Sequence, residues 1–154
     1  MVIETGKNPN AFTLPDQKGR DLAVSDLKNC YKLLSFHPLA WTEISSGQMK
    51  DLEDNYDRFE DLNTVPLGIS VDPVPAKRAW SEDLQLEKLK ILSDFYPLGF
   101  AARMMGIFIE SEGFSRRANI LLDERGKVIW TEDYDISELP DIARVLQMIE
   151  KFRR

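Results

Sequence analysis

Short apolar runs that are typical of buried strands alternate with segments of helical periodicity along this chain. Residues 32–36 (KLLSF) and 64–71 (TVPLGISV) are expected to be buried strands. Residues 48–60 place apolar side chains on one helix face and charged side chains on the other, and residues 75–84 follow as a helix with a proline near its start. This alternation predicts an α/β fold, in which helices cover the faces of a sheet.

The second half of the chain continues the pattern. We expect a short strand at residues 91–92 and a helix at residues 100–105, which ends at Gly106. A β-hairpin at residues 117–131 and a C-terminal helix at residues 138–152 should follow. Glu124, Arg125 and Gly126 form the turn signal of the hairpin. The order of elements predicts a three-layer α/β sandwich with a central mixed sheet, as in the thioredoxin-like architecture. No linker or repeat divides residues 1–154, so we expect one domain.

Composition excludes several classes of function. Hydrophobic residues make up 43% of the 154 residues, which is enough for a packed core. The net charge of −6, with acidic and basic residues interspersed, argues against nucleic acid or an anionic membrane as a partner. No apolar stretch is long enough to span a bilayer, and the first residues do not resemble a signal peptide. With one cysteine no intramolecular disulfide is possible, and we expect a cytoplasmic protein.

The segment 36–45 (FHPLAWTEIS) carries the strongest functional signal. With Pro38 and Thr42 in place, it resembles the active-site segment of the peroxiredoxins, the AhpC/TSA family, whose motif is Pro-x-x-x-Thr-x-x-Cys. The cysteine of that motif attacks the peroxide. In this chain the corresponding position is Ser45.

The resemblance continues along most of the chain, at residues 11–16 (AFTLPD), 68–72 (GISVD), 92–94 (LSD) and 117–123 (RANILLD). It implies that Pro38, Thr42, Arg117 and the position of Ser45 form a peroxide-binding constellation. It also implies hydrogen peroxide or alkyl hydroperoxides as substrates, an external thiol as reductant and a homodimer. For the dimer contact, the run 95–100 (FYPLGF) is our candidate.

The chemistry of such a site depends on the sulfur atom. A strand that ends at Phe36, a loop and a helix that starts near Ser45 place residue 45 where backbone N–H groups favour an anion. A cysteine there would have a lowered pKa. A serine is far harder to ionise and cannot form a sulfenic acid. We therefore expect no thiol peroxidase activity from the chain as it stands.

Other roles for Ser45 are weighed beside this one. The spacing Ser45-x-x-Gln48 fits a capping box, in which the serine hydroxyl binds a free N–H of the first helical turn. A serine hydrolase using His37 is disfavoured, because no acidic partner or oxyanion motif is evident. Two origins of the serine stay open: an engineered Cys→Ser substitution in a one-cysteine peroxidase, or a natural loss that leaves a non-catalytic binding or interaction module.

The remaining candidate residues are expected to have structural roles. Cys30 precedes the first core strand without a nearby cation and is expected to be incidental. His37 is expected to be structural or to lie at the rim of the pocket. It has no second ligand at metal-binding spacing, so we expect no metal, and no cofactor is predicted. Alternation along a strand predicts that Arg116 faces solvent and Arg117 the opposite side.

Overall fold

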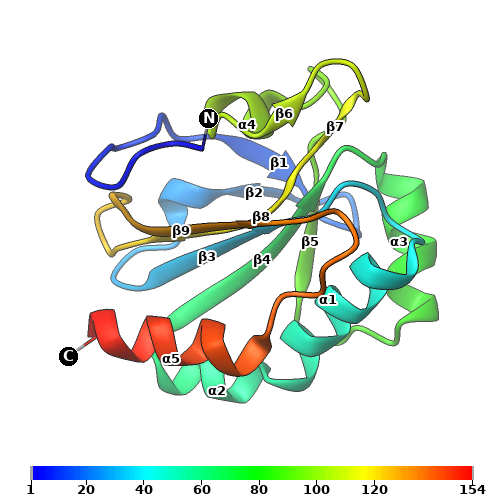
Figure 1. Ribbon diagram of the computed structural model, residues 1–154. Helices are drawn as coiled ribbons and strands as arrows, with labels where there is room; N and C mark the ends of the chain where they lie inside the picture. Colours follow the sequence, from blue (N-terminus) through cyan, green and yellow to red (C-terminus); the bar gives the residue numbers. More distant parts are fainter. Residues whose placement is uncertain (1, 154) are drawn as a thin grey trace.

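A five-stranded mixed sheet forms the centre of the computed structural model, which describes residues 2–153 (Figure 1). Its strands lie in the order β5-β4-β3-β8-β9. β3, β4 and β5 run parallel to one another, and β8 pairs antiparallel with both β3 and β9. The bounds are β3 (Tyr31–Phe36), β4 (Thr64–Ser70), β5 (Lys90–Ser93), β8 (Arg117–Leu122) and β9 (Val128–Tyr134).

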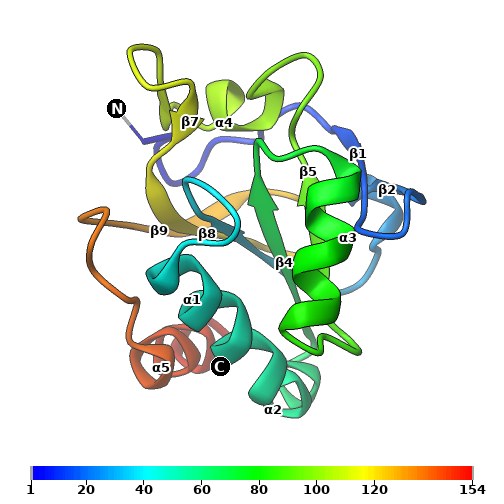
Figure 2. The same cartoon turned by 90° about the vertical axis from the view of Figure 1, so that its right-hand side faces the viewer.

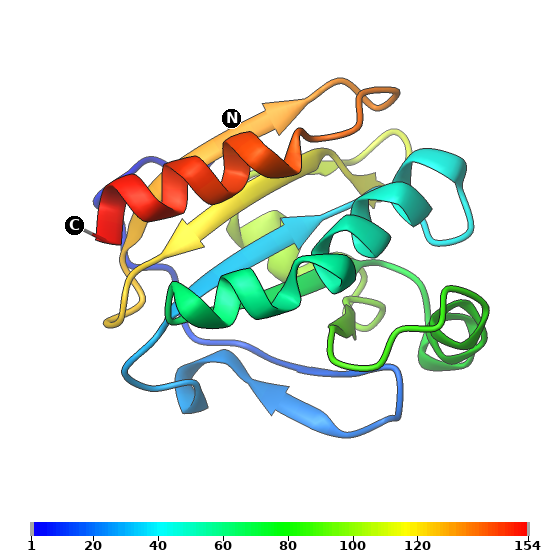
Figure 3. The same cartoon turned by 90° about the horizontal axis from the view of Figure 1, so that it is seen from below.

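Helices cover one face of this sheet. Figure 3 shows α1 and α2 across β3 and β4, and α5 across β8 and β9, while α3 lies beside β4 and β5 in Figure 2. On the opposite face lie the hairpin of β1 and β2, the short helix η1 and α4, with the small β6–β7 ribbon next to α4 (Figure 1). The bounds of these elements are α1 (Glu43–Asp54), α2 (Tyr56–Asp61), α3 (Val74–Asp83), α4 (Phe100–Met104), α5 (Ile142–Arg153), η1 (Val24–Asp26), β1 (Thr13–Pro15), β2 (Asp21–Ala23), β6 (Phe108–Ile109) and β7 (Phe114–Ser115).

Each face of the sheet has its own hydrophobic core. Alternation along β3 sends Leu33 toward the helices and Leu34 toward the N-terminal hairpin. Leu33 belongs to a cluster that includes Phe59 of α2 and Trp80 of α3, whereas Leu34 belongs to a cluster with Phe12. This arrangement of two cores around one sheet confirms the predicted three-layer α/β sandwich.

The helix predicted over residues 48–60 differs from the structure. The helix begins earlier, at Glu43, and is interrupted at Asn55, so that two helices replace one. The Asn55 side chain donates a hydrogen bond to the carbonyl of Asp51, 2.8 Å away. An amide side chain that binds the backbone in this way favours a helix end, which the apolar spacing did not indicate. Within residues 2–153, none of the helices is long and apolar enough to cross a membrane.

Candidate functional site

The predicted site residues meet at one edge of the sheet because of the strand directions. β3 ends at Phe36, and the loop that carries Pro38 leads from it into α1. β8 runs antiparallel to β3 and pairs Ala118 with Phe36, so its first residue, Arg117, lies beside the start of this loop. Residues that are about 70 positions apart in the chain therefore share one site.

Ser45 and Arg117 are in direct contact. A terminal guanidinium nitrogen of Arg117, Nη1, donates a hydrogen bond to the Ser45 hydroxyl oxygen at 3.1 Å. Ser45 lies in the first turn of α1 and is fully buried, and Arg117 is only 2% exposed. The hydroxyl of residue 45 thus faces a buried cation.

The Arg117 guanidinium is held by neutral acceptors only. Nη1 also donates to the Gln48 side-chain oxygen at 2.7 Å, and Nε and Nη2 donate to the Ile136 carbonyl at 3.2 and 2.8 Å. Among residues 2–153, no carboxylate lies within salt-bridge distance of Arg117. Burial lowers the pKa of Arg117, but an arginine keeps its charge at physiological pH. Its positive charge is therefore not neutralised by a partner and can stabilise an anion at position 45.

Gln48 is a further residue of this cluster, which the sequence did not identify as part of the site. Its amide nitrogen donates to the Ser35 hydroxyl at 2.8 Å and to the Phe36 carbonyl at 3.2 Å, while its oxygen accepts from Arg117. Gln48 thereby connects β3 to the guanidinium and fixes the position of the cation. The predicted pairing of Gln48 with Ser45 was the available signal, but it was assigned to helix capping.

The capping-box prediction is wrong. α1 begins at Glu43, which makes Thr42 the N-cap residue and places Ser45 inside the first turn. No side chain caps the helix at Thr42, whose hydroxyl donates instead to the Leu39 carbonyl at 3.2 Å. A residue within the helix cannot act as its N-cap, so the Ser45 hydroxyl is left to accept from Arg117.

A hollow of about 290 Å³ opens above this cluster. Pro38, Thr42 and Arg117 line it, together with Leu39, Glu43, Ile44, Phe114, Ile136 and Ser137. Most of the wall is apolar, and Thr42 is exposed at the surface. Ser45 is not part of this wall, because its side chain is buried next to Arg117. The hollow could take a small substrate with a polar head and an apolar group.

A second buried polar network supports the loop from behind. Lys77 of α3 is fully buried and donates a hydrogen bond to the Ser70 hydroxyl at 2.6 Å. Ser70 in turn donates to the Asp72 carboxylate at 2.6 Å, and the same carboxylate oxygen accepts from the Ala40 N–H at 2.8 Å. The network thus fixes the loop between β3 and α1 at Ala40.

His37 borders this network and is not at the pocket rim. It is fully buried, with Nε2 3.4 Å from the Lys77 ammonium and its ring 5.3 Å from that of Trp80. Burial, with a smaller contribution from Lys77, holds the pKa of His37 well below its usual value. Burial also lowers the pKa of Lys77 to about 7, although Asp72 and Asp94 oppose this change. His37 is therefore neutral at physiological pH and has a structural role, one of the two roles expected for it.

The other singled-out residues lie outside the site. Arg116 is exposed and pairs with Asp133 at 3.1 Å, on the other side of the strand from buried Arg117, which confirms the predicted alternation. Cys30 is partly buried before β3, at the opposite end of that strand from the loop of Pro38. Trp41 is 53% exposed and donates to the Ala76 carbonyl at 3.3 Å.

Comparison with known proteins agrees with this geometry. The AhpC/TSA family model matches residues 5–131. Alkyl hydroperoxide reductase E of Mycobacterium tuberculosis is 30% identical over 141 residues, which cover 91% of this chain and 92% of the relative. Peroxiredoxin 2 of Picrophilus torridus is 27% identical over 154 residues, covering 97% and 76% of the two chains.

Solved structures agree with the fold. AhpC of Enterococcus faecalis matches with a TM-score of 0.90 at 19% identity, covering 97% of this chain and 92% of that one. Peroxidoxin BcpB of Mycobacterium tuberculosis matches with a TM-score of 0.86 at 23% identity, covering 99% of both. These likenesses confirm the predicted thioredoxin-like sandwich. Since the family model matches most of the chain and its relatives align along nearly its whole length, this protein belongs to the AhpC/TSA family, the peroxiredoxins.

Proposed function

We propose that this scaffold serves the thiol-dependent reduction of hydrogen peroxide or alkyl hydroperoxides, and that residue 45 is the position of the nucleophile. The observation that carries the proposal is the hydrogen bond of 3.1 Å between Arg117 and Ser45 beneath the hollow of Pro38 and Thr42. A peroxide in that hollow would have its reacting oxygen near the cation. Thr42 lines the same wall, and its hydroxyl oxygen, whose proton is donated to the Leu39 carbonyl, would accept a hydrogen bond from a peroxide O–H.

With a cysteine at position 45, the reaction balances as follows. The thiolate sulfur attacks one peroxide oxygen, the O–O bond breaks, and the leaving alkoxide or hydroxide takes up a proton to become an alcohol or water. The sulfur is oxidised to a sulfenic acid. Two thiol groups of an external reductant then return it to the thiol, and in doing so they are oxidised to a disulfide and water is released. Arg117 would stabilise the thiolate and the charge that develops on the leaving oxygen.

With Ser45 the chain should not turn over. The Ser45 hydroxyl contacts a cation, but no base lies within hydrogen-bond distance of it among the described residues. A helix N-terminus contributes about 1 kcal/mol, which is far too little to form an alkoxide at neutral pH. Oxygen also has no equivalent of the sulfenic acid cycle.

The test is a Ser45→Cys variant assayed with hydrogen peroxide and dithiothreitol beside the unaltered chain. We expect peroxide consumption by the variant alone, with a sulfenic acid trapped at position 45 and detected by mass spectrometry. Ser46→Cys is the matched control, because it places a thiol one residue away without the Arg117 contact. A folded Ser45→Cys protein with no more turnover than Ser46→Cys would refute the proposal.

We also propose a homodimer formed through residues 95–100. Four large apolar or aromatic side chains in this short run are exposed: Phe95 by 50%, Tyr96 by 87%, Leu98 by 43% and Phe100 by 43%. Exposed apolar side chains that are close together are typical of protein–protein contacts. Light scattering at micromolar concentration should give the dimer mass, and Tyr96→Glu should give the monomer mass. A monomer mass for the unaltered chain would exclude this part of the proposal. The cytoplasmic location expected from the sequence stays a prediction, which cell fractionation can test.

A further inference from the structure

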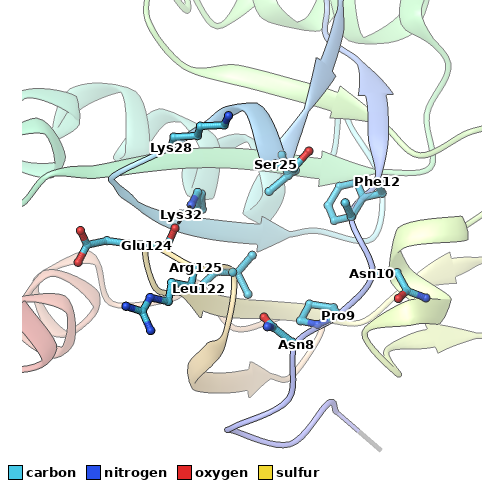
Figure 4. Close-up of a pocket in the computed structure, with 13 residues that line it drawn as sticks. Asn8, Pro9, Asn10, Phe12, Ser25, Lys28, Lys32, Leu122, Glu124 and Arg125 are labelled. Atoms are coloured by element: carbon cyan, nitrogen blue, oxygen red, sulfur yellow. Dashed lines mark hydrogen bonds between the residues drawn. The ribbon is translucent and has the colours of Figure 1, made fainter.

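A second hollow, of about 410 Å³, lies on the hairpin face of the sheet (Figure 4). It lies near the start of β3, whereas Ser45 follows the end of that strand. Three chain segments surround it: residues 8–12 before β1, residues 24–28 around η1, and residues 122–126 at the turn between β8 and β9. Two residues of the sheet also line the hollow: Lys32, the second residue of β3, and Leu122, which pairs with Lys32 on the neighbouring strand β8. At about 3.3 Å per residue, Lys32 lies roughly 13 Å from the end of β3 that carries the peroxide site.

Lys32 is an unusual residue in this position. It is only 3% exposed, although lysine is rarely buried without a charged partner. Its ammonium donates only to the backbone carbonyls of Glu124 and Asp123, at 3.3 and 3.5 Å. Both distances exceed the usual range for such bonds, and an ammonium has three N–H groups to donate. Within the part of the chain that the structure describes, no carboxylate lies within salt-bridge distance of it.

The residues around Lys32 indicate which kind of ligand could bind to its ammonium group. Figure 4 shows the side chains of Phe12, Ser25 and Leu122 around the same space, whereas the Glu124 carboxylate is directed away from it. Phe12 and Leu122 are core residues, so the hollow has an apolar floor beside a buried positive charge. Lys28 adds a second positive charge at the rim of a chain whose net charge is −6.

A single negative charge on an apolar body fits this lining. Phosphate groups are usually held by several backbone N–H groups at a helix start or by arginine forks. Lys28 and Arg125 also line this hollow, but both are exposed, so that Lys32 alone offers a buried positive charge among the residues of the lining. A carboxylate can accept a charge-assisted hydrogen bond from one ammonium, while its apolar part is removed from water by the floor. The volume lies within the range of small-molecule sites.

We propose that this hollow is a binding site for a small organic carboxylate with an aromatic or branched apolar group, whose carboxylate is held by Lys32. The site is separate from the peroxide site, so the proposal does not depend on peroxidase activity. The proposal gives Lys32 a binding role that would account for its burial without a charged partner among the described residues.

The test is a ¹⁵N NMR titration of the unaltered chain with benzoate, and with benzyl alcohol as the neutral match of similar shape. We expect saturable shifts of the backbone amides of Phe12, Ser25 and Gly126 with benzoate at millimolar concentration. The affinity for benzyl alcohol should be at least about tenfold lower than that for benzoate, because the charged hydrogen bond is lost. Inorganic phosphate, which has charge but no apolar group, should cause no saturable shift at these amides.

Variants locate the site. Lys32→Met should weaken benzoate binding about tenfold or more. Lys50→Met, at a partly exposed lysine of α1 that does not line the hollow, should leave binding unchanged. If Lys32→Met does not fold, Ser25→Trp serves instead, because an indole at this exposed position would fill the hollow. Equal binding of benzoate and benzyl alcohol, stronger binding of phosphate, no saturable shift with benzoate, or full binding by either variant would each overturn the proposal.

Discussion

Replacement of Lys77 tests whether the network behind the loop between β3 and α1 contains a buried lysine that loses its proton near pH 7. Burial lowers the pKa of Lys77 to about 7 in the folded protein, from its ordinary value of 10.5 in an unfolded chain. Between these two values the unfolded chain binds one more proton than the folded one. The free energy of unfolding therefore rises with pH in this window and is independent of Lys77 below it.

The size of this rise follows from the two pKa values. A full proton of difference adds about 1.4 kcal/mol to the free energy of unfolding for each pH unit. At pH 7 the folded protein has lost about half of the Lys77 proton, and at pH 9 nearly all of it. From pH 7 to pH 9, Lys77 should therefore contribute a rise of about 2 kcal/mol.

Urea unfolding at pH 7, 8 and 9, followed by tryptophan fluorescence, measures this rise. Lys77→Met should remove it, because methionine does not titrate and has a similar length. Lys50→Met is the matched control, since Lys50 is 43% exposed and should keep the rise of the unaltered chain. The two variants and the unaltered chain share their other side chains, so the comparison isolates the contribution of Lys77. A rise that persists in Lys77→Met, or a flat profile of the unaltered chain, would refute the argument.

Three further perturbations test the site and its support. His37→Phe should make the protein more resistant to acid. Burial lowers the pKa of His37, so the free energy of unfolding of the unaltered chain decreases as the pH falls below about 6.5. Chemical unfolding at pH 5 and 6.5 should show a smaller decrease for the variant. In a Ser45→Cys background, Arg117→Met should lower kcat/KM for hydrogen peroxide roughly 100-fold or more. Arg117→Lys should restore little of this activity, because a lysine cannot contact residue 45 and Gln48 in the same way. Equal values of kcat/KM with arginine and with methionine at position 117 would exclude Arg117 from the mechanism. Gly68→Ala should destabilise by about 1–3 kcal/mol in urea unfolding, because a methyl group there would collide with the Met49 sulfur inside the core, and an unchanged midpoint would contradict that packing.

The central sheet could be predicted because its strands are continuous apolar runs. The three inner strands, β3, β4 and β8, are buried along most or all of their length, and burial on both faces produces such runs in the sequence. The strands that were missed are short: β1 and β2 have three residues each, and β6 and β7 have two. Periodicity over two or three residues carries no signal, and the pairing of these strands depends on packing against the finished sheet.

The site was only partly accessible from the sequence. Pro38, Thr42, Ser45 and Arg117 were named from a resemblance, and the structure brings them together at the edge where β3 ends and β8 begins. The Lys77 network could not be predicted, because its contact with His37 joins residues 40 positions apart. A lysine on an amphipathic helix is expected to face solvent, and only the packing of α3 against the sheet shows that this one is buried.

The error at Ser45 shows how a correct spacing can be given the wrong cause. Residues three apart in a helix share one face, so Ser45 and Gln48 were rightly paired. Because the helix begins two residues before Ser45, this shared face meets Arg117 and not the free N–H groups of the helix start. Gln48 and the Ile136 carbonyl hold the guanidinium through contacts that do not involve residue 45. Exchanging oxygen for sulfur at position 45 should therefore leave the cation in place, which is what the proposed function requires of the Ser45→Cys variant.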